Sequence, residues 1–348
     1  MAGHDSQLIR VAGDITPEWL GTALGRSGPI EVLSAGRIGT GQMSQNYRVV
    51  FREGDGPEES VVAKLASADE TSRKTGVQMR AYWREVSLYR ELGARLEGIV
   101  PTCHLAVYDE GEGWFTLLLS DVRDGEQGDQ IRGCDLTGAR AAVATLAAMQ
   151  ARVLDDPAVG SLEFLSLPNL MSQQLLAGVL PGFLERYADR VSPEHAAVCR
   201  SFVPRLDSWA ADRRAPLGLI HGDYRLDNIL FSEQGCTVVD WQTVLWGPAL
   251  HDLSYFIGSG LTPADRRRHE QELVRLFHDE LLAGGVQALS WDECWTEYRR
   301  QAFHGLIMTI AASMLVERTD RGDDMFMIWF ARAAQQILDL DSLDLVPA

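Results

Sequence analysis

The first third of the chain alternates apolar and polar residues over short runs, which is the pattern of strands with one buried face. Strands are predicted within residues 31–65 and over WFTLLLSD, residues 114–121. In the segment VVAKLA, Val61 and Leu65 point to one face of the strand, whereas Lys64 points to the other. These runs predict a small, β-rich lobe at the N-terminal end of the chain.

Helical patterns dominate after about residue 135. In the N-terminal part, one short helix is predicted after Thr16, with Pro17 in its first turn, and a second helix over residues 78–96. Long helices are predicted in the rest of the chain over residues 136–154, 169–188, 193–212, 263–283, 291–318 and 323–340. We therefore expect an α+β fold of two lobes, with residues 1–121 in the first and residues 122–348 in the second.

The densest polar signal interrupts an apolar setting, in the segment LIHGDYRLDNILF at residues 219–231. A hairpin that turns at residues 232–235 would bring Asn228 close to Asp240, which ends the apolar strand CTVVD. An amide oxygen and a carboxylate are ligands that suit Mg²⁺. Asp223 would then orient a substrate hydroxyl and accept its proton, so the set fits phosphoryl transfer. The alternative interpretation is a polar hairpin with capping acids.

Composition narrows the class of partner. The chain has 348 residues, 46% of them hydrophobic and 23% charged, which is typical of a globular protein with room for two lobes. The net charge of −17 argues against nucleic acid and against an anionic membrane surface as partners. The five scattered cysteines form no CxxC pair and suggest free thiols in the cytoplasm. We expect no secretory signal at the start, and GLIMTIAASMLV is too short to span a bilayer.

Two motifs of the C-terminal half resemble a known superfamily. HGDYRLDNILF and VVDWQTVLWGPALHDLSYF are similar to segments of aminoglycoside phosphotransferases, choline kinases and ecdysteroid kinase-like proteins, and most similar to those of the last branch. The resemblance covers nearly the whole chain. It implies the fold of protein kinases, ATP or GTP as phosphoryl donor, Mg²⁺, and a small hydroxylated molecule as acceptor.

The resemblance also implies roles for residues of the first lobe. Lys64 matches the strand lysine that contacts nucleotide phosphates, and Glu85 matches the helix acid that holds this lysine. Gly39 and Gly41 allow the backbone to approach phosphates, and Ser44 stands where a third glycine is usual. A solvated edge lysine, a surface acid and a plain turn are the alternatives for these residues taken singly.

In the second lobe, the resemblance makes Asp223 the catalytic residue and Asn228 and Asp240 the metal ligands. His221 matches a histidine that braces the catalytic loop, and Asp252 matches an acid that accepts hydrogen bonds from the backbone of this loop. His304 is interpreted as a core histidine rather than a ligand.

Three functional interpretations follow. The first is a small-molecule O-kinase, and a short connection after Asp240 without H-R-D, D-F-G or A-P-E motifs disfavours a protein acceptor. The second is a catalytically silent, nucleotide-binding regulatory module of the same fold. The third, a metal-dependent hydrolase, is disfavoured because no His/Asp cluster with ligand spacing occurs. The acceptor stays open among antibiotic, choline-like, sugar-like and steroid-like alcohols, as do the choice between ATP and GTP and the oligomeric state.

Overall fold

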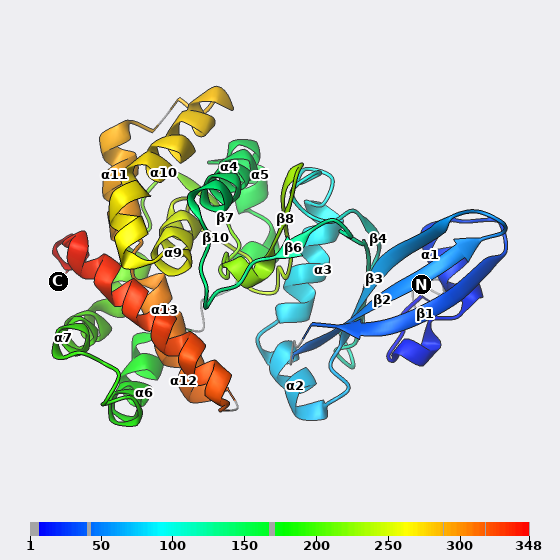
Figure 1. Ribbon diagram of the computed structural model, residues 1–348, viewed down its shortest axis with the longest axis horizontal. Helices are drawn as coiled ribbons and strands as arrows, with labels where there is room; N and C mark the ends of the chain where they lie inside the picture. Colours follow the sequence, from blue (N-terminus) through cyan, green and yellow to red (C-terminus); the bar gives the residue numbers. More distant parts are fainter. Residues whose placement is uncertain (1–6, 40–42, 167–170, 288, 317, 348) are drawn as a thin grey trace. The chain divides into compact units, whose positions relative to one another are not determined.

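The computed structural model of the chain describes residues 7–39, 43–166, 171–287, 289–316 and 318–347. These residues form two compact units (Figure 1). The first comprises Met1–Asp124 together with Thr237–Val244, and the second comprises Gly125–Cys236 together with Leu245–Ala348. The first unit contains most of the strands and the second contains most of the helices, as the sequence pattern predicts.

The first unit is built on a five-stranded antiparallel sheet in the order β1-β2-β3-β5-β4. The N-terminal strand run predicted from the sequence is confirmed, whereas the edge strand β4 carries no clear signal in its sequence. The bounds of the strands are β1 (Ile30–Ile38), β2 (Ser44–Glu53), β3 (Glu58–Ala66), β4 (Cys103–Tyr108) and β5 (Phe115–Ser120).

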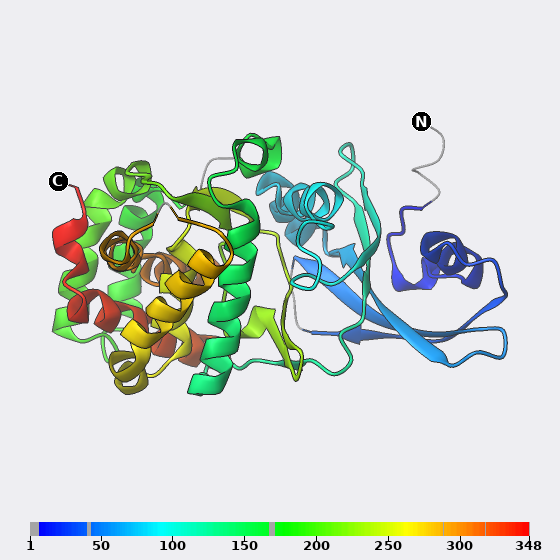
Figure 2. The same ribbon diagram turned by 90° about the horizontal axis from the view of Figure 1, so that it is seen from above.

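The two faces of this sheet have different partners. One face carries Phe51 and Leu118 and packs against helix α1 (Pro17–Leu24) (Figures 1 and 2). The predicted cap of α1 is confirmed, because the hydroxyl of Thr16 accepts a hydrogen bond from the backbone N–H of Trp19. The opposite face carries Lys64 and is covered by helix α3 (Ala81–Glu91).

The helix predicted over residues 78–96 is wrong in its bounds. The structure has two helices here, α2 (Glu70–Gln78) and then α3. Asp69 caps the start of α2. Arg80, which lies between the two helices, adopts a left-handed backbone (φ 53°) that separates α2 from α3. The predicted span includes only the last residue of α2, so this helix was missed, and α3 ends at Glu91, before the predicted end.

The second unit consists mainly of helices around one buried helix, α9, all ten residues of which are buried. Helix α4 lies against α10 (Figure 2). The bounds are α4 (Leu136–Val153), α5 (Pro157–Gly160), α6 (Gln173–Arg186), α7 (Pro193–Phe202), α8 (Leu206–Ala211), α9 (His251–Gly260), α10 (Pro263–Ala283), α11 (Trp291–Arg300), α12 (His304–Leu315) and α13 (Asp320–Asp339).

Two of the predicted long helices are interrupted. The helix expected over residues 193–212 divides into α7 and α8 around a 3₁₀ turn that contains Pro204, whose ring cannot continue an α-helix. The helix expected over residues 291–318 divides into α11 and α12, and the indole of Trp209 donates a hydrogen bond to the carbonyl of Arg300 where α11 ends. Among the described residues, none of the helices has the length and apolarity that crossing a membrane requires.

Short strands frame the polar segment of the second unit. β7 (Leu217–Ile220) pairs with β10 (Leu245–Pro248), and β6 (Glu126–Gln127), β8 (Ile229–Ser232) and β9 (Gly235–Val238) form a second small sheet in the order β6-β8-β9. The predicted hairpin at residues 232–235 is thus present as β8 and β9. The chain passes from the second unit to the first within β9.

We expect Phe51→Ala to lower the free energy of unfolding by about 3–5 kcal/mol, because it removes a buried aromatic ring from the face against α1. Val50→Ala is the matched control on the same strand: this half-buried side chain lies on the opposite face, and its truncation should cost about 1 kcal/mol. Urea unfolding measures both values. Equal losses for the two variants would contradict the assignment of the core to the Phe51 face.

Candidate active site

The first unit contains a buried ion-pair cluster around Lys64. The Lys64 side chain lies on the sheet face that α3 covers and is only 4% exposed. Its Nζ donates to Oε1 of Glu85 and to Oδ1 of Asp240, at 2.7 Å in each case. Burial on its own would lower the pKa of Lys64, but the Asp240 and Glu85 carboxylates outweigh burial and raise it. The ammonium group is therefore fixed and charged.

Asp240 has an unusual backbone. Its φ of 65° lies in the left-handed region, which a residue with a side chain rarely adopts. The next residue fixes this turn, because the backbone N–H of Trp241 donates to Oε1 of Glu85 at 3.2 Å. Strained backbone of this kind gathers at functional sites. The Asp240 side chain is 45% exposed although one of its oxygens binds Lys64.

Two of the predicted phosphate-binding residues, Gly39 and Ser44, are described by the structure. Gly39 has a φ of 71°, a conformation that favours glycine. Ser44 starts β2 opposite Ala66 of β3, and its hydroxyl accepts a hydrogen bond from the Gln242 side chain at 3.2 Å. Gly41, the other glycine of this prediction, lies outside the described residues.

In the second unit, Asp252 of α9 holds the loop that follows β7. Its Oδ2 accepts from the backbone N–H of His221 at 2.6 Å, and its Oδ1 accepts from that of Gly222 at 3.1 Å. Burial raises the pKa of Asp252 to about 7, although both backbone hydrogen bonds lower it. The resemblance implied, without naming the donors, that this acid accepts hydrogen bonds from the backbone of the loop.

Two histidines complete the support of the loop. The His221 ring accepts a hydrogen bond at Nδ1 from the backbone N–H of Asp223, at 3.2 Å. His304 donates from Nε2 to the carbonyl of Gly222 at 2.8 Å, because a carbonyl can only accept. Burial lowers the pKa of His304, which keeps this ring neutral. His304 is thus a core histidine that also touches the loop.

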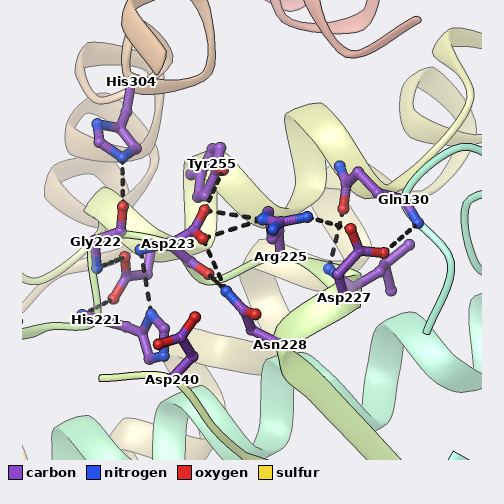
Figure 3. Close-up of polar contacts among 12 residues, drawn as sticks. Gln130, His221, Gly222, Asp223, Arg225, Asp227, Asn228, Asp240, Tyr255 and His304 are labelled. Carbon is purple, nitrogen blue, oxygen red and sulfur yellow. Dashed lines mark hydrogen bonds and ion pairs between the residues drawn. The ribbon is translucent and has the colours of Figure 1, made fainter. Parts of the chain in front are cut away.

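Asp223 receives hydrogen bonds from three side chains (Figure 3). Tyr255 of α9 donates from its hydroxyl to Oδ1 at 2.9 Å, and Asn228 donates from Nδ2 to Oδ2 at 2.8 Å. Arg225 shares one Nε–H between both oxygens, at 3.1 and 3.0 Å. The Asp223 side chain is still 20% exposed. It is therefore held in place without being closed to solvent.

The amide of Asn228 has a defined orientation. Its nitrogen donates to the backbone carbonyl and to the carboxylate of Asp223, at 2.9 and 2.8 Å, and both partners are acceptors. The amide oxygen is therefore the atom left to bind a hard cation, which fits Asn228 as a magnesium ligand. In the part of the chain that the structure describes, no group of three or more His, Cys, Asp or Glu side chains could hold a metal. A site of one amide, one carboxylate and phosphate oxygens needs no such group.

The structure thus gathers the predicted residues in two sets. Lys64, Glu85 and Asp240 are together in the first unit. Asp223 and Asn228 are together in the second unit. The predicted sharing of a metal by Asn228 and Asp240 joins residues of different units, and it stays a prediction.

A family model now adds to this geometry. The model of the phosphotransferase enzyme family matches residues 36–299, which include both sets of residues. The chain belongs to the phosphotransferase enzyme family. The superfamily inferred from the HGDYRLDNILF motif is thereby confirmed.

Solved structures show the same fold at low sequence identity. A putative aminoglycoside phosphotransferase from Ralstonia eutropha superposes with a TM-score of 0.54 at 15% identity, over 95% of this chain and 98% of that one. A choline kinase from Cryptosporidium parvum gives a TM-score of 0.55 at 12% identity, over 94% and 95% of the two chains. The ADP-bound aminoglycoside phosphotransferase APH(2'')-Ib gives 0.53 at 15% identity, over 92% and 97%. The predicted α+β, protein-kinase-like fold is confirmed.

Two curated relatives match a shorter stretch. Acyl-CoA dehydrogenase family member 11 of Homo sapiens and of Pongo abelii are each 32% identical to this chain over 99 residues. The match covers 25% of this chain and 13% of each relative, so the matched stretch corresponds to a small part of those proteins.

The sequence interpretation missed three side chains of the candidate site: Arg225, Tyr255 and Gln130. Gln130 accepts from the backbone N–H of Leu226 at 3.0 Å and donates to the carbonyl of Ser259 at 3.1 Å. Tyr255 could have been found, because it follows Asp252 by three positions and therefore lies on the same face of α9. No signal in the sequence marks Gln130.

We expect Glu85→Gln to weaken the binding of Mg-ATP by about tenfold, because Lys64 loses one of the two charge-assisted hydrogen bonds that aim it. Isothermal titration calorimetry measures the affinity. Glu91→Gln is the matched control, since Glu91 is exposed on the same helix α3. Unchanged affinity in Glu85→Gln would remove Glu85 from the nucleotide site.

Asp252 should leave a signature in the pH dependence of stability. Its pKa is raised in the folded state, so between roughly pH 4, the ordinary value, and about 7 the folded chain binds a proton that the unfolded chain has released. The free energy of unfolding should therefore fall by on the order of 4 kcal/mol as the pH rises through this window. The contribution of this group to stability is fully present only at low pH. Urea unfolding of wild type and Asp252→Asn against pH tests this. Parallel curves for the two proteins would contradict it.

Proposed function

We propose that this protein is an O-phosphotransferase that moves the γ-phosphoryl group of ATP or GTP to a hydroxyl of a small molecule. The observation that carries the proposal is the environment of Asp223, a carboxylate fixed by three side chains and still 20% exposed. A fixed and reachable carboxylate can orient a hydroxyl and accept its proton. Membership of the phosphotransferase enzyme family supports the reaction class.

The proposed reaction requires few groups of the protein to take part in the bond changes. The acceptor oxygen forms a bond to the γ-phosphorus, and the bond from this phosphorus to the bridging oxygen of the nucleotide breaks. Asp223 takes the hydroxyl proton, and the nucleoside diphosphate leaves with the electron pair of the broken bond.

The remaining residues bind and position the substrates. Lys64, aimed by Glu85, contributes positive charge to the nucleotide phosphates. Gly39, Gly41 and Ser44 are the proposed phosphate-binding residues. The oxygens of Asn228 and Asp240 would hold Mg²⁺, which would neutralise phosphate charge. Residues 1–121 serve as the nucleotide-binding lobe, and residues 122–348 supply the catalytic loop and the acceptor site.

The short connection after Asp240 favours a small acceptor. β10 begins at Leu245, and α9 begins at His251. Protein kinases have a long activation segment at this point, against which a peptide binds. Ten residues of which four form a strand leave no such segment.

The acceptor class is best addressed by a panel. Structures with the same fold are named for complexes with hygromycin B and gentamicin, and another is a choline kinase. The matched relatives are named as acyl-CoA dehydrogenase family members, so hydroxylated acyl thioesters join the panel with sugar and steroid alcohols. Acceptor-stimulated release of ADP or GDP identifies both the acceptor and the preferred nucleotide.

We place the reaction in the cytoplasm. All five cysteines are free thiols in the structure. Burial raises the pKa of Cys199 and Cys294 to about 12, so these thiols stay protonated. Free, unreactive thiols are typical of a reducing compartment.

Asp223→Asn should reduce phosphoryl transfer by about a hundredfold to ten-thousandfold, because the amide cannot accept the hydroxyl proton. Calorimetry on the same variant should give the wild-type affinity for Mg-ATP. Glu233→Gln, in the exposed turn between β8 and β9, is the control and should keep full turnover. If wild type and Asp223→Asn both bind nucleotide but transfer to no member of the panel, the protein is a regulatory module.

A further inference from the structure

The hydrogen-bonding capacity of Asp223 is fully used. An ionised carboxylate offers about four lone-pair sites, two on each oxygen. Tyr255 and the shared Nε–H of Arg225 occupy Oδ1, and Asn228 and the same Nε–H occupy Oδ2. An incoming hydroxyl must therefore displace one of these three donors before it can bind to Asp223.

Two of the donors are poorly suited to leave. Tyr255 belongs to the buried helix α9. Burial is the main reason why the pKa of its hydroxyl lies well above the ordinary value. The Asn228 nitrogen is held twice, by the carboxylate and by the backbone carbonyl of Asp223. Moving either side chain would leave a polar group without its partner inside the protein.

Arg225 is the donor that can be exchanged. Its side chain is 21% exposed, and it has a second anchor, because Nη1 donates to Oδ2 of Asp227. Asp227 is itself fixed, since its Oδ1 accepts from the backbone N–H of Gln130 at 3.1 Å and its carbonyl accepts from the Gln127 side chain at 2.6 Å. The guanidinium group can therefore leave Asp223 and stay bound to Asp227 (Figure 3).

We propose that Arg225 protects Asp223 from water in the resting protein and leaves it only when an acceptor binds, so that it selects an acceptor hydroxyl over water. The inference rests on the proposed function. Arg225 is a positioning residue, because it acts through Asp223.

The selection has a physical basis. Water reaches a carboxylate that is 20% exposed, and an unprotected Asp223 would activate it against a bound nucleotide. Water brings no other contacts that could offset the loss of the Arg225–Asp223 ion pair. An acceptor binds through the rest of its surface as well, and this binding energy can offset the displacement of the guanidinium group. The freed positive charge then lies next to the carboxylate that orients the acceptor.

The test measures hydrolysis of Mg-ATP and Mg-GTP without any acceptor. Arg225→Met keeps an unbranched side chain but removes every donor, so hydrolysis should rise by about tenfold, the ratio that matches one charge-assisted hydrogen bond. Arg225→Lys keeps the charge and should stay near the wild-type rate. The double variant Asp223→Asn/Arg225→Met should lose the increase, because water activation requires the carboxylate.

Three controls separate this effect from damage to the fold. Calorimetry should give Mg-ATP affinities within about twofold of wild type for Arg225→Met, well below the factor expected for a lost contact. Arg190→Gln breaks an exposed ion pair with Asp324 (3.0 Å) in the same unit and should not change hydrolysis. Tyr224→Phe reports the cost of losing a buried tyrosine hydroxyl that does not bind Asp223, because this hydroxyl donates to the carbonyl of Ala142 at 2.8 Å.

The outcomes distinguish the inference from the proposed function. Hydrolysis by Arg225→Met at or below the wild-type rate overturns the inference, even if the wild type phosphorylates an acceptor. An increase that persists in the double variant also overturns it. An increase that depends on Asp223 supports the inference, even if every acceptor of the panel fails and the proposed acceptor class falls.

Discussion

The geometry of the candidate site in the second unit depends on one carboxylate, that of Asp252. It accepts hydrogen bonds from two consecutive backbone N–H groups, those of His221 and Gly222, and so fixes the residue that follows them. Asp252 belongs to a helix that is buried along its whole length, so it cannot shift unless the core of the second unit also moves. Through this side chain the hydrophobic core helps to position Asp223, as a precise site requires.

Local features of the fold could be predicted from the sequence. The alternation of residues around Lys64 correctly predicts the face of the strand on which this side chain lies. Thr16 and Pro17 correctly predict the start of α1. Both signals depend only on residues that are close together in the sequence. The helix breaks could not be predicted in the same way. The left-handed turn at Arg80 has no glycine to mark it, and the end of α11 depends on Trp209, which is 91 positions away in the chain.

The same distinction between local and long-range signals applies to the candidate site. Residues within a motif, such as Asp223, Asn228 and Asp252, could be named from the sequence because their spacing is part of the pattern. The direction of a side chain is a tertiary property, so the contacts of Tyr255 and Arg225 with Asp223 could be seen only in the structure. Gln130 could not be named in this way, because its role depends on contacts with Leu226 and Ser259, which are 96 and 129 positions away in the chain.

The discontinuity of the first unit has a practical consequence. Residues 237–244 complete this unit, with a backbone hydrogen bond from Val238 to Ile99 at 2.7 Å and the Gln242–Ser44 contact. A fragment that stops at residue 124 would lack Asp240 and leave the Lys64 and Glu85 pair without its third member. The first unit cannot be isolated by cutting the polypeptide once. A chimera that exchanges it between relatives must therefore have two junctions.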